Sequence, residues 1–307
     1  MYKPEIGLSS VFFILSLLSI SIFLSNAISY EYLTRFSGIP SSSRAVVLDP
    51  FNNRFKDIDG YQSSIDDIIK HLEYANYTVE YYRDEEVSLD IWRRICAGGY
   101  GVVYINTHGY IDQDGYVYLY LGELVDEVDP PIDVGISHLP LEEGVDERYI
   151  VVFPEFIRYY GRMDERSIIF VDACFSAYNP TMASAFIDSG AGCYVGWSGS
   201  VGVAVGARVD AEFFRYLARG DTVFTALSKS SIDPATAARL IAYGDPYIAL
   251  VDTDYRGSIY ILVHIVLFFM LSILFMILTF KKPKFIYSSL YNILEWIIWR
   301  KGRVHSI

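Results

Sequence analysis

The chain has few cysteines, and its central part has no long run of basic residues. Its 307 residues include only three cysteines, Cys96, Cys174 and Cys193, which lie far apart in the sequence. Disulfide scaffolds and zinc sites need more cysteines or close pairs of them, so neither is expected. The 25 basic and 37 acidic residues give a net charge of −12, and no Lys/Arg-rich run lies between residues 30 and 256. We therefore expect no nucleic-acid partner and no metal or other cofactor.

What is present includes an uncharged apolar run near the N-terminus. Residues 11–24, VFFILSLLSISIFL, have the length of a secretory signal core and follow Lys3. Residues 1–29 are predicted to be a signal peptide or a signal-anchor. Both alternatives stay open, because the A-x-A-like cleavage site is imperfect and the flanking residues extend the run to a marginal span.

A second apolar run lies near the C-terminus. Residues 259–280 contain no Asp, Glu, Lys or Arg, and as a helix they could cross about 30 Å of hydrocarbon, so a transmembrane helix is predicted over 257–280. Three lysines follow within residues 281–284, and the positive-inside rule places the C-terminus in the cytoplasm. Residues 30–256 are then expected outside the cytoplasm or in a lumen, on a single-pass or double-pass membrane protein.

The tail, residues 281–307, combines basic residues with Trp296, Trp299 and tyrosines. This composition is typical of a helix that lies in the headgroup region, so the lipid bilayer is an expected partner. A face for a partner helix is the competing interpretation. It would give the span and the tail a membrane-protein partner.

Residues 30–256 alternate between apolar runs and segments with helical periodicity. Strands are predicted at residues 45–49, 78–82, 101–107, 167–173, 193–197 and 247–251. Helices are predicted at residues 61–75, 87–97, 154–160, 181–189, 208–218, 221–229 and 234–242. Such alternation predicts an α/β fold with a mostly parallel sheet of about six strands and helices on both faces.

The segment after residue 115 departs from that alternation. Residues 116–121, YVYLYL, are predicted to form a short strand or hairpin arm, and an irregular acidic segment is expected up to about Glu147. Its residues Asp126, Glu127 and Asp129 could bind calcium, although a solvated loop needs no ion and is the preferred interpretation.

Polar residues follow two of the apolar strands. His108 and Gly109 follow the run GVVYINT, and Asp172, Ala173 and Cys174 follow the run SIIFV. Sites in open parallel sheets form beyond the carboxyl ends of the strands, so His108 and Cys174 emerge side by side if the two strands are neighbours. A histidine beside a thiol supplies the proton acceptor that a cysteine nucleophile needs. Each feature alone is usually structural, but the two together predict a His–Cys dyad.

The two motifs resemble those of the caspase–gingipain–legumain group of cysteine peptidases. The matching segments are VVYINTHGY (102–110), IIFVDACFSA (168–177), AGCYVGWSG (191–199) and YGDPYIAL (243–250). The resemblance spans about residues 44–252. It is closer to the gingipain-like and legumain-like branches than to caspases, because Phe175 and Ser176 follow the cysteine and the His–Cys separation of 66 residues exceeds the roughly 50 of caspases.

The resemblance implies roles for individual residues. His108 would be the general acid/base, Cys174 the nucleophile, and the backbone N–H of Gly109 an oxyanion donor. Trp197 and Ser198 are candidates for the pocket that holds the substrate residue before the scissile bond. Core packing is the alternative interpretation for Trp197.

Three acidic residues lie near these motifs in the sequence. If the strand alternation continues, Asp172 shares a strand face with Cys174, and a carboxylate there would disfavour the thiolate, so we interpret it as structural and hydrogen-bonded to nearby backbone. Asp210 and Glu212 could offer a carboxylate to a basic substrate side chain. A solvent-facing position on a helix is the preferred interpretation for both.

The motifs and the membrane segments together predict a membrane-anchored cysteine endopeptidase that cleaves protein or peptide substrates through an acyl-enzyme. A transamidase is the close rival, because the legumain-like subunit of the GPI-anchoring complex also has a signal, such a domain and a C-terminal span. A non-enzymatic membrane scaffold that uses a caspase-like domain for protein binding is the rival from another class.

Overall fold

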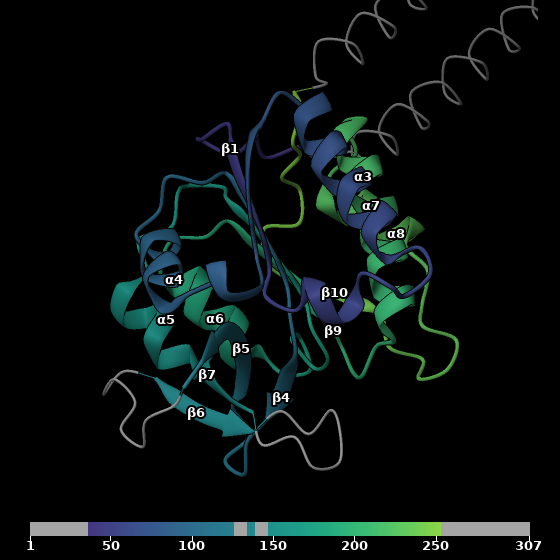
Figure 1. The fold of residues 1–307 in the computed structure, drawn as a ribbon. Helices are drawn as coiled ribbons and strands as arrows, with labels where there is room; N and C mark the ends of the chain where they lie inside the picture. Colours follow the sequence, from purple (N-terminus) through teal and green to yellow (C-terminus); the bar gives the residue numbers. More distant parts are fainter. Residues whose placement is uncertain (1–35, 126–133, 139–146, 253–307) are drawn as a thin grey trace, which may run out of the picture. The chain divides into compact units, whose positions relative to one another are not determined.

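A six-stranded sheet lies at the centre of the domain (Figure 1). The computed structural model describes residues 36–125, 134–138 and 147–252. The strand order is β10-β9-β8-β3-β1-β2. The bounds are β1 Arg44–Asp49, β2 Thr78–Arg83, β3 Val102–Asn106, β8 Ile168–Asp172, β9 Cys193–Trp197 and β10 Leu240–Gly244. Neighbouring strands are parallel except that β10 runs antiparallel to β9. The predicted α/β fold with a mostly parallel sheet is confirmed.

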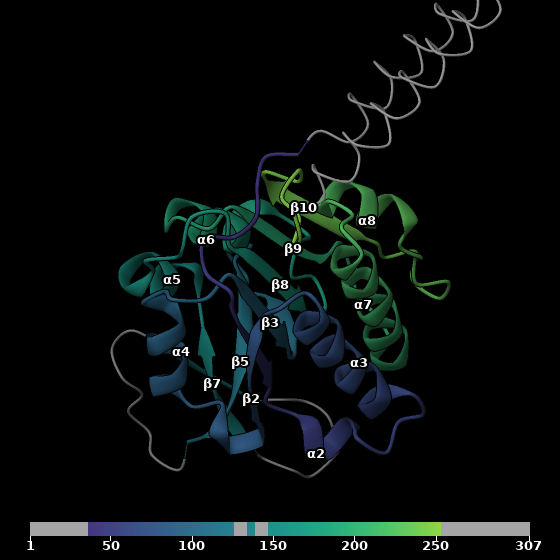
Figure 2. The same ribbon diagram turned by 90° about the horizontal axis from the view of Figure 1, so that it is seen from above.

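Helices cover both faces of this sheet, as predicted (Figures 1 and 2). One face carries α3 Tyr61–Tyr74, α7 Val203–Ala218 and α8 Val223–Lys229. The other carries α4 Leu89–Cys96, α5 Pro154–Tyr160 and α6 Pro180–Asp188. Two short helical turns, α2 Asn52–Phe55 and the 3₁₀ turn Asp84–Glu86, complete the described helices. The sheet therefore separates two buried clusters, one against each helical layer.

The central strands are buried along their whole length. Every residue of β3 (VVYIN), β8 (IIFVD) and β9 (CYVGW) is buried. Strands covered on both faces are continuous apolar runs rather than alternating ones, which is why the sequence locates them. Each fully buried large apolar side chain contributes about 1.5–3 kcal/mol, so the ends of these strands are rigidly placed.

A second sheet has four antiparallel strands in the order β4-β5-β7-β6. The bounds are β4 Gly109–Ile111, β5 Val117–Leu124, β6 Gly135–His138 and β7 Arg148–Val152. The irregular segment predicted up to about Glu147 is therefore wrong in part, since β5 continues to Leu124 and β6 lies inside it. The strand β6 has one apolar residue, Ile136, and its order comes from pairing with β7, where Ile136 lies opposite Ile150.

The helix predicted at 234–242 and the strand predicted at 247–251 are wrong. Residues 240–244 form β10, whereas residues 247–251 make only isolated bridges. The alanine-rich sequence before β10 favours a helix by propensity. Pairing with β9 overrides that preference, because Leu240 lies opposite Trp197 and both side chains are buried.

The membrane segments predicted at 1–29 and 257–280, the tail 281–307 and the acidic residues proposed for calcium lie outside the described residues. Within the part of the chain that the structure describes, no helix is long and apolar enough to cross a membrane. The membrane anchor therefore stays a prediction.

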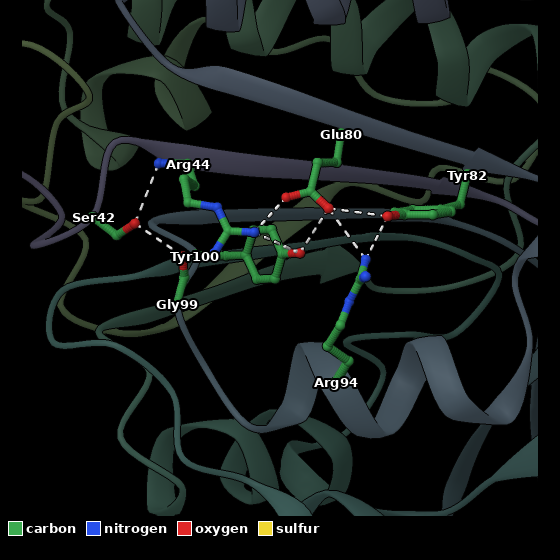
Figure 3. A network of polar contacts seen from close by, with 7 residues as sticks. All are labelled: Ser42, Arg44, Glu80, Tyr82, Arg94, Gly99 and Tyr100. Carbon is green, nitrogen blue, oxygen red and sulfur yellow. Dashed lines mark hydrogen bonds and ion pairs between the residues drawn. The ribbon is translucent and has the colours of Figure 1, made fainter.

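The outer edge of the large sheet carries a network of charged and aromatic residues (Figure 3). Glu80 of the edge strand β2 forms ion pairs with Arg44 and with Arg94, the latter at 3.1 Å. The hydroxyls of Tyr82 and Tyr100 donate to the same carboxylate, each at 3.0 Å. Burial alone would raise the pKa of Glu80, but these partners outweigh it and hold the pKa below its ordinary value. The network fixes β2 to β1 and to α4.

Candidate active site

The two strands that carry the candidate dyad are neighbours, as the sequence analysis required. Strands β3 and β8 are parallel, with Asn106 opposite Asp172. The register continues past the strand ends, because the Thr107 N–H donates to the Asp172 carbonyl at 2.9 Å. His108 and Cys174 thus leave the same edge of the sheet from paired positions.

Gly109 lies directly against the backbone of Cys174. A Cβ atom on Gly109 would sit 2.5 Å from the carbonyl oxygen of Cys174 and 3.0 Å from the Cβ of Ala173. No side chain fits there, so the approach of β4 to the end of β8 requires glycine. This contact joins the two motifs at the level of the backbone.

The N–H of Gly109 points away from β5 and is free to donate a hydrogen bond. The Tyr120 N–H donates to the His108 carbonyl at 3.1 Å, which makes the neighbouring Gly109–Leu119 pair a non-hydrogen-bonded pair of the antiparallel ladder. In such a pair the N–H points away from the partner strand. Across the described residues, no backbone carbonyl accepts the Gly109 N–H, which is what an oxyanion donor needs.

Cys174 is the accessible thiol among the three cysteines. Its side chain is half-buried, whereas Cys96 and Cys193 are fully buried. Burial raises the pKa of the Cys96 thiol to about 12 and also raises that of Cys193. Those two residues are therefore inert packing thiols, and Cys174 is the one that a reagent or substrate can reach.

The Cys174 sulfur is held by the segment before α7. The Val201 N–H donates to Sγ at 3.4 Å, and Sγ lies 3.6 Å from the Val201 carbonyl and 3.5 Å from Oγ of Ser200. Residues 200 and 201 precede Gly202, the N-cap of α7. The sulfur therefore contacts the segment that leads directly into α7. Neither Ser200 nor Val201 is among the predicted site residues; the signal that could have identified them is the serine–glycine run SGSVG (198–202) directly before a helix.

The chain turns sharply after Cys174 with strained backbone. Phe175 has φ of 60°, a left-handed conformation that costs a bulky residue about 1–2 kcal/mol. Hydrogen bonds impose it: the Phe175 N–H donates to Gly199 at 2.9 Å, and the Ser176 hydroxyl donates to Val171 at 2.9 Å. Strain of this kind concentrates at functional sites.

His108 sits in an aromatic environment. Its ring centroid lies 4.7 Å from that of Phe51, 5.3 Å from that of Phe55 and 6.3 Å from that of Tyr120. Burial lowers the pKa of His108 to about 4, and the charge of Arg54 adds to the effect. The imidazole is therefore neutral at physiological pH and able to accept a proton.

The imidazole and the thiol are not hydrogen-bonded to each other in the described part of the chain. Nε2 of His108 is buried there without a hydrogen-bond partner. The sulfur of Cys174 is hydrogen-bonded to Ser200 and Val201 instead. Catalytic hydrogen bonds often form only when substrate is bound. The structure thus places both groups at one rim without the bond between them.

Two of the three acidic residues near the motifs, Asp172 and Asp210, lie in the core, contrary to the expectation for Asp210. Asp210 is fully buried and accepts from the Tyr104 hydroxyl at 3.0 Å, so it cannot meet a substrate side chain. Asp172 faces α7, where a Cβ on Gly206 would lie 2.8 Å from its carboxylate, and its side-chain neighbour is Asp210 rather than backbone. Glu212 is paired with Arg208 at 3.7 Å on the helix surface.

Burial is the main influence on the pKa values of these two aspartates, and their contact with each other is the next. Burial raises the pKa of Asp172 to about 6, and burial with the nearby charge of Asp172 raises the pKa of Asp210 well above its ordinary value. No ion pair to either carboxyl occurs within the described residues. One proton is therefore held between the two groups at neutral pH.

The two predicted pocket residues have different surroundings. Trp197 is fully buried and belongs to the core, so its side chain offers no surface to a substrate and packing is the interpretation that its position supports. Ser198 is half-buried at the end of β9, and its hydroxyl accepts from the Arg239 N–H at 3.0 Å. No group of His, Cys, Asp and Glu side chains suited to a metal ion occurs in the described residues.

Comparison with known protein families and with curated proteins found no match for this chain. The functional interpretation therefore depends on the residues and the geometry described above.

Proposed function

We propose that the chain is a membrane-anchored cysteine endopeptidase in which Cys174 is the nucleophile and His108 moves the proton. The observation that carries the proposal is the junction of the two motifs, where Gly109 lies against the backbone of Cys174 at the shared end of β3 and β8. A half-exposed thiol, a neutral imidazole and a free backbone N–H leave one edge of the sheet. Acyl transfer needs those three groups.

The proposed reaction has two steps. In the first, the thiol of Cys174 gives its proton to His108 while its sulfur attacks the peptide carbonyl carbon. The carbonyl oxygen becomes an anion that accepts hydrogen bonds from the N–H groups of Gly109 and Cys174. The C–N bond then breaks, and the amine leaves with the proton from the imidazolium. In the second, water attacks the thioester and releases the carboxylic acid and the free thiol.

The surroundings of His108 favour the neutral ring over a resting ion pair. The aromatic side chains of Phe51, Phe55 and Tyr120 give the imidazolium no counter-charge. The proton is therefore expected to move in the transition state rather than before substrate binds, and the Cys174 thiol rests on the Val201 backbone until then.

The test is cleavage of a peptide library by the purified full-length chain, with Cys174→Ala and His108→Ala as the two dyad variants. The exposed Tyr159→Ala on α5 is the matched control. Wild type and Tyr159→Ala should cleave the same peptides, and the dyad variants should lose at least about 10²-fold of the rate. Retained cleavage in Cys174→Ala would refute the proposal.

Adding hydroxylamine to the same reactions separates the rival activity. A peptidase should give mainly carboxylic acid products, whereas a transamidase should give mainly hydroxamate and little acid. Binding of peptides with no product of either kind would favour the scaffold.

A further inference from the structure

The segment that holds the Cys174 sulfur is itself fixed at every residue. Facing the sheet, Gly199 accepts the Phe175 N–H at 2.9 Å and the Val201 N–H reaches Sγ at 3.4 Å. Ser200 is exposed, yet its hydroxyl lies 3.5 Å from the sulfur. Two hydrogen-bond donors of one surface loop, a hydroxyl and an amide, thus converge on one thiol. This arrangement favours a functional role for the loop.

A second segment, residues 233–239, holds the first one from its outer side. The Thr236 hydroxyl donates to the Ser200 carbonyl at 2.7 Å, and the Asp233 carboxylate accepts the Gly202 N–H at 2.8 Å. The Ser198 N–H donates to the Arg239 carbonyl at 2.9 Å. Residues 198–202 are thus bound between the sulfur on one side and residues 233–239 on the other.

We propose that Ser200 is a positioning residue for the Cys174 sulfur, and that Thr236 sets the reactivity of the thiol by holding Ser200 in place. The neutral thiol can donate to the Val201 carbonyl, and the sulfur anion can accept from both the Ser200 hydroxyl and the Val201 N–H. Two donors favour the anion more than the thiol. The role of Cys174 as a nucleophile rests on the function proposed above, but the hydrogen bonds to its sulfur do not depend on that function.

The other titratable groups around the sulfur are few in the described residues. Tyr110 of β4 lies near enough for Cys174 to affect its titration, and burial raises its pKa, so it stays neutral at physiological pH. Asp233 lies behind the loop, and the Gly202 N–H holds its pKa below the ordinary value. Neither group changes charge between pH 6 and 9, and His108, with its pKa lowered to about 4, also stays neutral there, so a pH profile over that range reports on the sulfur.

The test is the rate at which iodoacetamide alkylates Cys174 in the full-length chain between pH 6 and 9, followed by mass spectrometry of the peptide that contains it. The thiolate sulfur displaces iodide, forms a thioether and leaves the thiol proton in solvent. Cys96 and Cys193 are buried and serve as internal references for intact folding. The variants are Ser200→Ala, Ser200→Thr and Thr236→Val, and Ser63→Ala on α3 is the matched exposed-serine control.

Loss of a hydrogen bond to a charged group predicts a rate about tenfold lower at pH 7 in Ser200→Ala, with the midpoint of the pH profile displaced to higher pH. Ser200→Thr should restore both, Thr236→Val should show a smaller change of the same sign, and Ser63→Ala should match wild type. An unchanged midpoint, or faster alkylation at every pH, would overturn the proposal, since a loosened loop only exposes the sulfur. If the variants change the alkylation rate and midpoint as predicted but the wild-type chain cleaves no peptide, the proposed function would be refuted and this inference would still hold.

Discussion

Glu80 and Asp172 are both carboxylates on strands of the central sheet, and their surroundings shift their pKa values in opposite directions. Glu80, on the edge strand, is surrounded by two arginines and two tyrosine hydroxyls that stabilise its charge. Asp172, under the candidate site, faces Asp210 and has no ion pair within the described residues. The edge is arranged for stability, whereas the site keeps an electrostatic conflict, as functional sites often do.

The two regions therefore predict opposite dependences of stability on pH. The contribution of Glu80 is present above its unfolded pKa and is lost as the pH falls, because its folded pKa is lowered. The aspartate pair is least costly below the unfolded pKa of its carboxyls. For Asp172 the cost grows as the pH rises from the unfolded pKa to about 6, the folded pKa, and is constant above that.

The largest effect is expected where the site leaves no space. Gly109→Ala places a methyl group 2.5 Å from a backbone oxygen that cannot move away, and overpacking of this kind should cost about 3 kcal/mol of unfolding free energy and abolish activity. Gly199→Ala is the control, since its Cβ would lie 3.6 Å from Ala238, an ordinary contact. Urea unfolding of the two variants should separate them; equal stabilities would contradict the close approach.

The next effect sharpens the comparison at the aspartate pair. Asp210→Asn removes the cost of keeping that buried carboxyl protonated in the folded state, keeps the acceptor for the Tyr104 hydroxyl, and should raise the unfolding free energy by about 2 kcal/mol at pH 8. The gain should shrink at pH 4, where both carboxyls are neutral. Thermal unfolding at the two pH values measures this gain in unfolding free energy. A gain of the same size at pH 4 and pH 8 would show that ionisation of the buried pair is not its source.

A third effect concerns the base. With the pKa of His108 at about 4, the ring stays neutral well below the range of an ordinary histidine. At pH 5.5 the value of kcat/KM should remain near its neutral-pH value, whereas a base with a pKa near 6.5 would have lost about tenfold. A pH–rate profile with its acid limb near pH 6.5 would show that substrate or charge restores the ordinary pKa.

The burial of the His108 ring should also lower the folding stability as the pH falls from about 6.5 toward 4.

The smallest effect is expected at the edge. Glu80→Gln weakens two half-exposed ion pairs and should cost about 0.5–1 kcal/mol at pH 7, with the cost shrinking as the pH falls and the carboxylate is protonated. Glu165→Gln, in a more exposed pair with Arg166, is the control and should change little. A loss at pH 3 equal to that at pH 7 would mean that packing, not charge, explains the role of Glu80.

The sequence predicts some parts of this molecule well for physical reasons that particular residues illustrate. Strands β3 and β8 are found because burial on both faces makes VVYIN and IIFVD continuous apolar runs, and their polar ends mark the site. Of the small sheet the sequence predicts β5, at residues 116–121. Strand β10 and the other strands of the small sheet are missed because pairing with β9 and β7 decides them. The sulfur contacts of Ser200 and Val201 depend on a loop whose path the sequence does not reveal.

The most direct test of the central claim is the intact mass of the chain after incubation with peptidyl acyloxymethylketones that carry basic, acidic or Asn side chains next to the ketone. The account predicts a single covalent adduct on Cys174 in wild type, none in Cys174→Ala, and a rate at least about 10²-fold lower in His108→Ala. No adduct with any of these probes, or an adduct that persists without Cys174, would contradict it.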